Sequence, residues 1–105
     1  MEVVIISDAK NPYLRGLTEQ AIATSGVRCI VVEKQPIDYE NAITIHYDFD
    51  FNYNRCLNLG YRRTVDNVCF ANNDVLFGTD WTKVEPYLTK YGSLSLTFLL
   101  EDIYV

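Results

Sequence analysis

The chain has 105 residues, 49% of them hydrophobic, and a formal net charge of −5. This length holds one hydrophobic core, so we expect a single domain over residues 1–105, and the composition is too apolar for a disordered chain. The acidic balance argues against a nucleic acid partner and against docking on an anionic membrane. No apolar run approaches the roughly 20 residues that span a bilayer.

Two features of the sequence predict a cytoplasmic protein. The segment Met1–Ile6 lacks the basic region and the small-residue cleavage site of a signal peptide. The three cysteines, Cys29, Cys56 and Cys69, are odd in number and widely spaced, and each lies in or beside an apolar stretch. Free thiols buried in a protein of the reducing cytosol fit this pattern, whereas a structural zinc site would need closer spacing.

The first third of the chain predicts a βαβ unit. Residues 2–7 and 28–33 form apolar, largely β-branched runs, which are typical of strands buried on both faces of a parallel sheet. Between them, Asn11 and Pro12 suit the start of a helix and Gly26 suits its end. We expect the crossover between the two strands to be right-handed.

The middle of the chain continues the alternation of strands and helices. After a polar connection around Pro36, we expect a short strand over residues 43–47. A helix should follow over about residues 52–63, with Gly60 at a close contact, because glycine otherwise weakens a helix interior. Residues 68–71 read as another buried strand.

The last part of the sequence predicts one more helix and one more strand. Thr79 or Asp80 can cap a helix over residues 81–91, which Gly92 would end. Residues 93–98 alternate between apolar and polar side chains, as in a strand with two different faces.

These elements together predict an α/β fold, with a Rossmann-like, mostly parallel sheet and helices on both of its faces. In such sheets, ligands bind beyond the carboxyl ends of the strands. The polar residues expected at those ends are Ser7, Asp8, Glu33, Lys34 and the triplet Asn72–Asp74.

The triplet Asn72-Asn73-Asp74 follows directly on a predicted strand. Asp74 can supply a carboxylate and Asn72 an amide oxygen to Mg²⁺ or Mn²⁺, which prefer oxygen ligands and often bind substrate phosphates as well. The alternative is a turn in which these side chains cap their own backbone.

Two segments around this triplet carry a family pattern. Residues 55–60, RCLNLG, are similar to a helix pattern of the type Ala-Arg-Asn-x-Gly, and residues 70–75, FANNDV, are similar to a strand followed by an Asp-x-Asp-type motif. Residues 5–14 look like a first strand and its loop. Over roughly residues 2–91, the chain resembles the nucleotide-sugar-binding half of family-2-type glycosyltransferases, which implies a GT-A-type three-layer α/β sandwich.

The resemblance implies a role for each matching position. The donor would be a nucleotide-diphospho-sugar, held through Mn²⁺ or Mg²⁺, which neutralises the charge that develops on the leaving diphosphate. Glu33 would accept a hydrogen bond from the edge of the base, and Asn72 and Asp74 would hold the metal. The other positions implied in donor binding are Ser7, Asp8, Arg55, Asn58 and Asn73.

Two departures from the family pattern concern catalysis. Lys34 stands where the family has a second acidic residue, and family members continue well beyond Val105 with the part that holds the acceptor. We therefore expect a minimal or vestigial transferase, or a fragment of a larger one, with an unidentified acceptor. Glu101 and Asp102 resemble the catalytic acidic pair and could supply the base, but a solvated tail explains them as well.

Other functions remain open at this stage. A degenerate, non-catalytic transferase could act as a binding or oligomerisation module, and a homodimer would cover an unpaired sheet edge. A receiver-like signalling domain is a third hypothesis, since Asp8 and Asp48 match two of its acidic positions, but its late lysine is missing. His46 is read as a structural histidine, and Asp48-Phe49-Asp50 as the acidic start of a helix rather than a metal motif.

Overall fold

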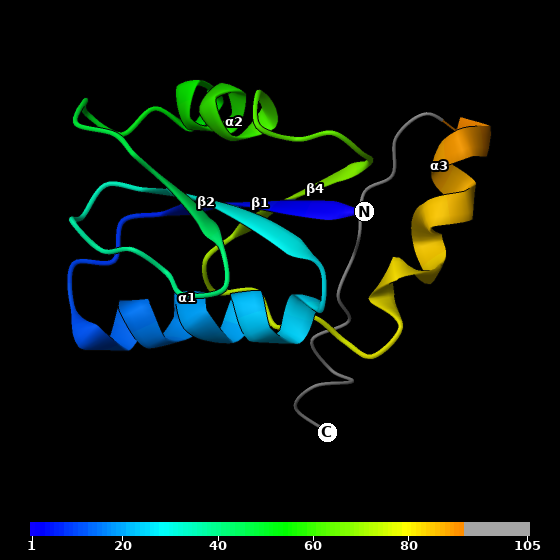
Figure 1. The fold of residues 1–105 in the computed structure, drawn as a ribbon, viewed down its shortest axis with the longest axis horizontal. Coiled ribbons are helices and arrows are strands. Elements are labelled where there is room, and N and C mark those ends of the chain that lie inside the picture. Colours follow the sequence, from blue (N-terminus) through cyan, green and yellow to red (C-terminus); the bar gives the residue numbers. More distant parts are fainter. Residues whose placement is uncertain (92–105) are drawn as a thin grey trace.

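The computed structural model describes residues 1–91, with side chains to residue 88. A four-stranded parallel sheet lies at its centre in the order β3-β2-β1-β4 (Figure 1). The strands are β1 (Glu2–Ser7), β2 (Arg28–Glu33), β3 (Ile43–His46) and β4 (Val68–Asn72). This order matches the first four strands of a doubly wound Rossmann sheet. The predicted α/β class with a parallel sheet is therefore confirmed, at the level of a Rossmann-like fold.

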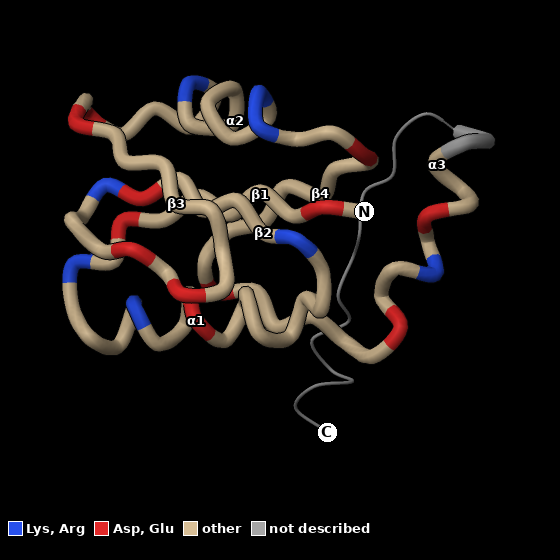
Figure 2. Tube along the Cα trace, viewed as in Figure 1, with Lys and Arg blue, Asp and Glu red and all other residues tan. Residues whose placement is uncertain are grey.

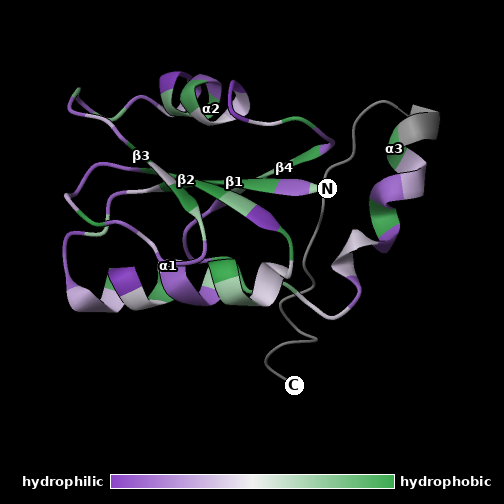
Figure 3. Cartoon of the chain, in the orientation of Figure 1, coloured by the Kyte–Doolittle hydropathy of each residue, from purple (hydrophilic) through white to green (hydrophobic). Residues whose placement is uncertain are grey.

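Helices cover both faces of this sheet, as expected. Helix α1 (Pro12–Ser25) and helix α2 (Tyr53–Tyr61) lie on opposite sides of it in Figure 1. The central strand β1 packs on both, because Val3 and Ile5 belong to the core under α1 while Val4 and Ile6 belong to the core under α2. Figure 3 shows the resulting concentration of apolar residues along the strands.

The βαβ unit at the start of the chain has the predicted boundaries. Asn11 caps α1 by accepting a hydrogen bond from the Leu14 amide over 2.9 Å, and Pro12 occupies the first helical position. Gly26 ends the helix in the left-handed region, at φ 66°, which glycine adopts without a Cβ penalty.

The connection from β2 to β3 contains no helix. Residues 34–42 return on the α1 side of the sheet, where Ile37 and Ala42 pack against the core and Tyr39 is buried. The sequence predicted only a polar connection here, because a single buried tyrosine produces no periodic pattern.

Strand β4 differs from the prediction of a strand buried on both sides. Among its residues only Ala71 is buried, and Phe70 is 44% exposed. The reason is its place in the sheet: within residues 1–91, β4 pairs with β1 alone. An apolar run by itself does not distinguish a central strand from one at an edge.

The helix predicted over residues 81–91 is divided in two. A 3-10 turn, η1 (Trp81–Val84), precedes α3 (Glu85–Tyr91), and Asp80 has a φ of 60° and makes no capping hydrogen bond. Pro86 explains the division, since it has no N–H to donate to the Thr82 carbonyl as a continuous α-helix requires. The strand predicted over residues 93–98 lies outside the described residues.

Charged residues of both signs are interspersed over the loops, the helices and the ends of the strands (Figure 2). No helix among the described residues is long and apolar enough to cross a membrane. Cys29 and Cys56 are buried free thiols, as predicted, and Cys69 is half-buried. Burial raises the pKa of each of these three thiols, which favours the protonated form.

Gly60 lies at the predicted close contact, where α2 packs on the sheet. A Cβ at this position would collide with Val4 Cγ1 and lie 3.2 Å from Val32 Cγ2. We expect Gly60→Ala to lower the free energy of unfolding by about 1–3 kcal/mol, measured by urea denaturation, because both neighbours are fixed in the core.

Gly16→Ala is the matched control for this variant. Gly16 lies within α1, and a Cβ there meets nothing within 4 Å. We expect this substitution to raise the free energy of unfolding by about 0.5–1 kcal/mol. Equal stability of the wild-type protein and Gly60→Ala would contradict the close contact between α2 and the sheet.

Candidate functional site

The carboxyl end of β2 carries a completely buried carboxylate, that of Glu33. Its Oε1 accepts hydrogen bonds from Ser7 Oγ over 2.7 Å and from the Tyr39 hydroxyl. Its Oε2 accepts from the backbone amides of Ala9 over 2.9 Å and Gln35 over 3.1 Å. Four donors therefore satisfy both oxygens without any positively charged partner.

This set of hydrogen bonds explains why a charged side chain can lie in the core. An ionised carboxylate loses much hydration free energy on burial unless hydrogen bonds replace the water. The strand register places Ser7 directly opposite Glu33, and the two amides belong to the loops that follow β1 and β2. Glu33 thus holds together the ends of two strands, their loops and Tyr39.

A second group of polar contacts continues from Ser7 towards β4. Asn73 Nδ2 donates to Ser7 Oγ over 3.4 Å and to Thr18 Oγ1 over 3.3 Å. The Thr18 hydroxyl in turn donates to the Leu14 carbonyl one turn earlier in α1. A chain of polar side chains therefore runs across the carboxyl ends of three strands, from Asn73 through Ser7 to Glu33.

This arrangement determines how the triplet Asn72–Asp74 is presented. Asn73 is half-buried and fastens the turn to β1 and α1, whereas Asn72 and Asp74 on either side of it are exposed. The turn is also closed by a backbone hydrogen bond from Val75 to Asn72. The oxygens of Asn72 and Asp74 are thus accessible beside the end of β1, whereas the Asn73 side chain is hydrogen-bonded within the protein.

The other residues predicted to bind the donor are Asp8, Arg55 and Asn58, and they differ in whether they contact the polar side chains at the strand ends. Asp8 is half-buried and accepts a hydrogen bond from Gln35 Nε2 over 2.8 Å. Arg55 is exposed in the first turn of α2, with its guanidinium 4.0 Å above the Phe49 ring. Asn58 is exposed further along α2, and its side chain makes no hydrogen bond to another residue of the described part. Asp8 therefore belongs to the strand-end group, whereas Asn58 does not.

The internal hydrogen bonds of Glu33 bear on its predicted role in binding the base. A base edge that bonded Glu33 would have to displace one of its four internal donors. Glu101 and Asp102, predicted as a possible catalytic base, lie outside the described residues.

Two members of the site, Tyr39 and Thr18, have no distinguishing pattern in the sequence. Tyr39 is one of eight tyrosines, and Thr18 is a polar residue within the predicted helix. Both are buried; Tyr39 bonds to Glu33, six residues earlier, and Thr18 bonds to Asn73, 55 residues later. The one local indication for Thr18 in the sequence is that this polar residue lies beside the apolar stripe of the predicted helix.

Lys34 and His46 line an open pocket beyond β2 and β3. Lys34 Nζ donates to the Phe49 carbonyl over 3.1 Å. His46 Nε2 donates to the Ile37 carbonyl over 2.9 Å and lies 3.4 Å from Asp38 Oδ1. His46 therefore has a structural role, in agreement with its prediction, and it is also accessible from the pocket.

The described residues contain no preformed metal site of three ligands. Among the residues that the structure describes, no three His, Cys, Asp or Glu side chains are grouped so that they could hold a metal ion. A site made from Asp74 and an asparagine oxygen would depend on a substrate and water for its other ligands. No known family model, curated protein or solved structure matches the chain.

Replacing Glu33 tests the importance of the buried carboxylate. In Glu33→Gln, the new amide NH₂ would point at groups that themselves donate, so buried donors would lose their partner. We expect the free energy of unfolding to fall by about 3 kcal/mol in urea denaturation. Glu40→Gln removes the same charge at an exposed position and should change stability little. Equal effects of the two substitutions would contradict a structural role of Glu33.

Tyr39 should make the free energy of unfolding depend on pH in the alkaline range. Burial and the hydrogen bond to Glu33 raise the pKa of Tyr39 to about 12. The folded protein thus binds this proton more tightly than the unfolded chain, where the pKa is near 10. The contribution to stability is complete below about pH 10 and is lost as the pH rises through about 12.

Tyr39→Phe removes this contribution, and we expect its free energy of unfolding to fall less steeply than that of the wild type between pH 9 and 11. At neutral pH the variant should be about 1–2 kcal/mol less stable, since a hydrogen bond to a carboxylate is lost. Burial also raises the pKa of Tyr47, so the comparison must be made between the two proteins. Tyr13→Phe, at an exposed tyrosine, is the control. Identical pH slopes in Tyr39→Phe and the wild type would refute the assignment.

Proposed function

We propose that this chain binds a nucleotide-diphospho-sugar together with Mn²⁺ or Mg²⁺, as the donor-binding half of a GT-A-type glycosyltransferase. The observation that carries the proposal is the turn after β4. There Asn73 is bonded to β1 and α1, and the oxygens of Asn72 and Asp74 remain accessible on either side of it.

The position of this turn in the sheet supports the proposal. The chain leaves β1 for β2 on one side, and β4 lies on the other side of β1. The turn after β4 therefore lies beside the end of β1, and ligands of open α/β sheets bind beyond the carboxyl ends of the strands. The positions of the elements also fit the resemblance in sequence, since residues 55–60 lie in α2 and the triplet begins at Asn72, the last residue of β4.

The chemistry expected at this site is charge neutralisation. A cation held by Asp74 and an oxygen of Asn72 would complete its coordination with phosphate oxygens and water. It would stabilise the negative charge on the diphosphate as the sugar leaves. Glu101 and Asp102 are the candidates for the catalytic base, and the sugar acceptor is unidentified. Buried free thiols support a reducing compartment such as the cytoplasm.

A non-catalytic binding or assembly module is the second candidate. It is favoured by two exposed aromatic side chains at the β4 side of the sheet, Tyr61 and Phe70, whose ring centroids are 6.3 Å apart. Such a patch suits a partner or a second copy of the chain. If the protein dimerises and binds no sugar nucleotide, this candidate is supported over the first.

The proposed function is tested by titration calorimetry with UDP, UDP-glucose and GDP-mannose, each with and without Mn²⁺. We expect binding that requires the metal, and a loss of affinity of at least about tenfold in Asp74→Asn, because a carboxylate ligand of the cation is removed. Glu40→Gln has the same charge change at an exposed site in the β2–β3 connection and should bind normally. Absence of binding by the folded wild-type protein would refute the proposal.

A further inference from the structure

The side chain of Asn73 faces two buried hydroxyl groups whose protons are already used. Ser7 Oγ donates to Glu33 Oε1 over 2.7 Å, and the Thr18 hydroxyl donates to the Leu14 carbonyl over 3.0 Å. A hydroxyl group has a single proton, so each of these two oxygens can only accept a further hydrogen bond. The side chain that faces them must therefore supply donors.

The amide of Asn73 meets this requirement. Its Nδ2 lies 3.4 Å from Ser7 Oγ and 3.3 Å from Thr18 Oγ1, and it has one proton for each oxygen. An aspartate has the same shape, but its ionised carboxylate offers only acceptors. Position 73 therefore favours an amide over a carboxylate of the same size.

The buried carboxylate of Glu33 adds a second reason for an amide at this position. Only the Ser7 hydroxyl separates Glu33 Oε1 from the Asn73 side chain. A carboxylate at position 73 would bring a second negative charge close to the first, and two carboxylates in one site repel each other. Glu33 thus acts through Ser7 on the choice of side chain in the turn after β4.

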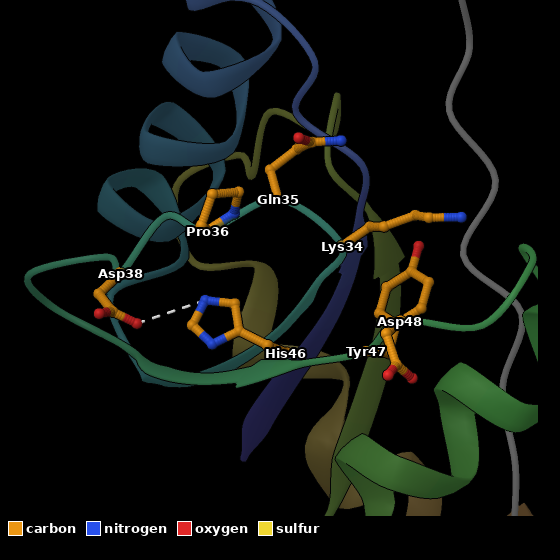
Figure 4. A pocket seen from close by; sticks show the side chains of 7 residues that line it. All are labelled: Lys34, Gln35, Pro36, Asp38, His46, Tyr47 and Asp48. Atoms are coloured by element: carbon orange, nitrogen blue, oxygen red, sulfur yellow. Dashed lines mark ion pairs between the residues drawn. The ribbon is translucent and has the colours of Figure 1, made fainter.

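The backbone of Ser7 is held from the side of the neighbouring pocket. Its carbonyl accepts hydrogen bonds from the backbone amide of Lys34 over 3.1 Å and from the Tyr47 hydroxyl over 3.4 Å. Both of these residues line the pocket beyond β2 and β3, which Figure 4 shows from close by. The oxygen that Ser7 offers to Asn73 therefore has a fixed place.

The exposed residues on either side of Asn73 depend on this attachment. Asn72 and Asp74, the proposed ligands of the cation, are joined to Asn73 through the backbone, so a fixed amide also fixes where their oxygens are presented. Groups that orient metal ligands without touching the metal are typically worth about 10- to 100-fold in affinity for it.

We propose that Asn73 is the positioning residue of the cation site in this turn and that the site requires an amide at position 73; this inference rests on the proposed function. Asn73 holds the turn against β1 and α1 through Ser7 and Thr18, while its two neighbours contact the cation. An added carboxylate should therefore have opposite effects at positions 72 and 73, although a cation by charge alone would favour both.

The test adds one carboxylate to the turn in two ways, as Asn73→Asp and as Asn72→Asp. Titration calorimetry gives the dissociation constants of UDP and GDP at saturating Mn²⁺. We expect Asn73→Asp to bind the preferred nucleotide at least about tenfold more weakly than the wild-type protein, because the turn loses its attachment. Asn72→Asp is the matched control with the same change of charge, and it should bind more tightly, since a charged ligand raises the affinity for the cation.

A second pair of variants decides the question if circular dichroism shows that Asn73→Asp is unfolded. Thr18→Val keeps the shape of the side chain but removes an acceptor of the Asn73 amide, whereas Thr18→Ser keeps the hydroxyl group. We expect Thr18→Val to weaken nucleotide binding by a smaller factor than Asn73→Asp does. Thr18→Ser should retain the wild-type dissociation constant, although the loss of a buried methyl group lowers its stability.

The results distinguish a failure of this inference from a failure of the proposed function. If folded Asn73→Asp binds as tightly as the wild-type protein, or if Asn72→Asp loses as much affinity, the positioning role is overturned and the proposed function stands. Equal dissociation constants of Thr18→Val and Thr18→Ser lead to the same conclusion. If the folded wild-type protein binds neither nucleotide in the presence of Mn²⁺, the proposed function and this inference are both refuted.

Discussion

The structure of this sheet end depends on the burial of one carboxylate. Glu33 lies at 0% exposure between the ends of β1 and β2, and four donors surround it. These donors come from the end of β1, the loop that follows it and the connection from β2 to β3, so satisfying the carboxylate also fixes both connections and the Tyr39 side chain. Removing a buried charge from water is tolerable only when its hydrogen bonds are complete, and this requirement makes the arrangement specific.

The same polar group divides the carboxyl end of the sheet into two regions. On one side, Asn73 bonds to Ser7 and Thr18 and leaves Asn72 and Asp74 accessible at the turn after β4. On the other side, the residues after β2 and β3 enclose an open pocket of mixed charge.

The predictions from sequence differ in accuracy according to the range of the interactions involved. The strands β1 and β2 and the helix between them have the expected boundaries because a buried β-branched run, an Asn-Pro start and a glycine end act within a few residues. The close contact at Gly60 was also foreseeable, since glycine destabilises a helix interior and its presence there indicates that a side chain would not fit. The position of β4 at the edge of the sheet formed by residues 1–91 and the division of the helix at Pro86 were not foreseen. The first depends on neighbouring strands, and the second on one missing N–H within an otherwise helical pattern.

The sequence by itself determined the α/β class, the approximate elements and the set of polar residues at the strand ends, because these follow from local periodicity and end signals. Only the tertiary structure decided which of those residues are available to a ligand. Ser7 and Glu33 are 26 positions apart and Ser7 and Asn73 are 66 apart, so their contacts follow from strand order and register. Residues of similar polarity therefore have opposite roles: Glu33 and Asn73 are bound within the protein, whereas Asp48 and Asp74 are exposed to the solvent.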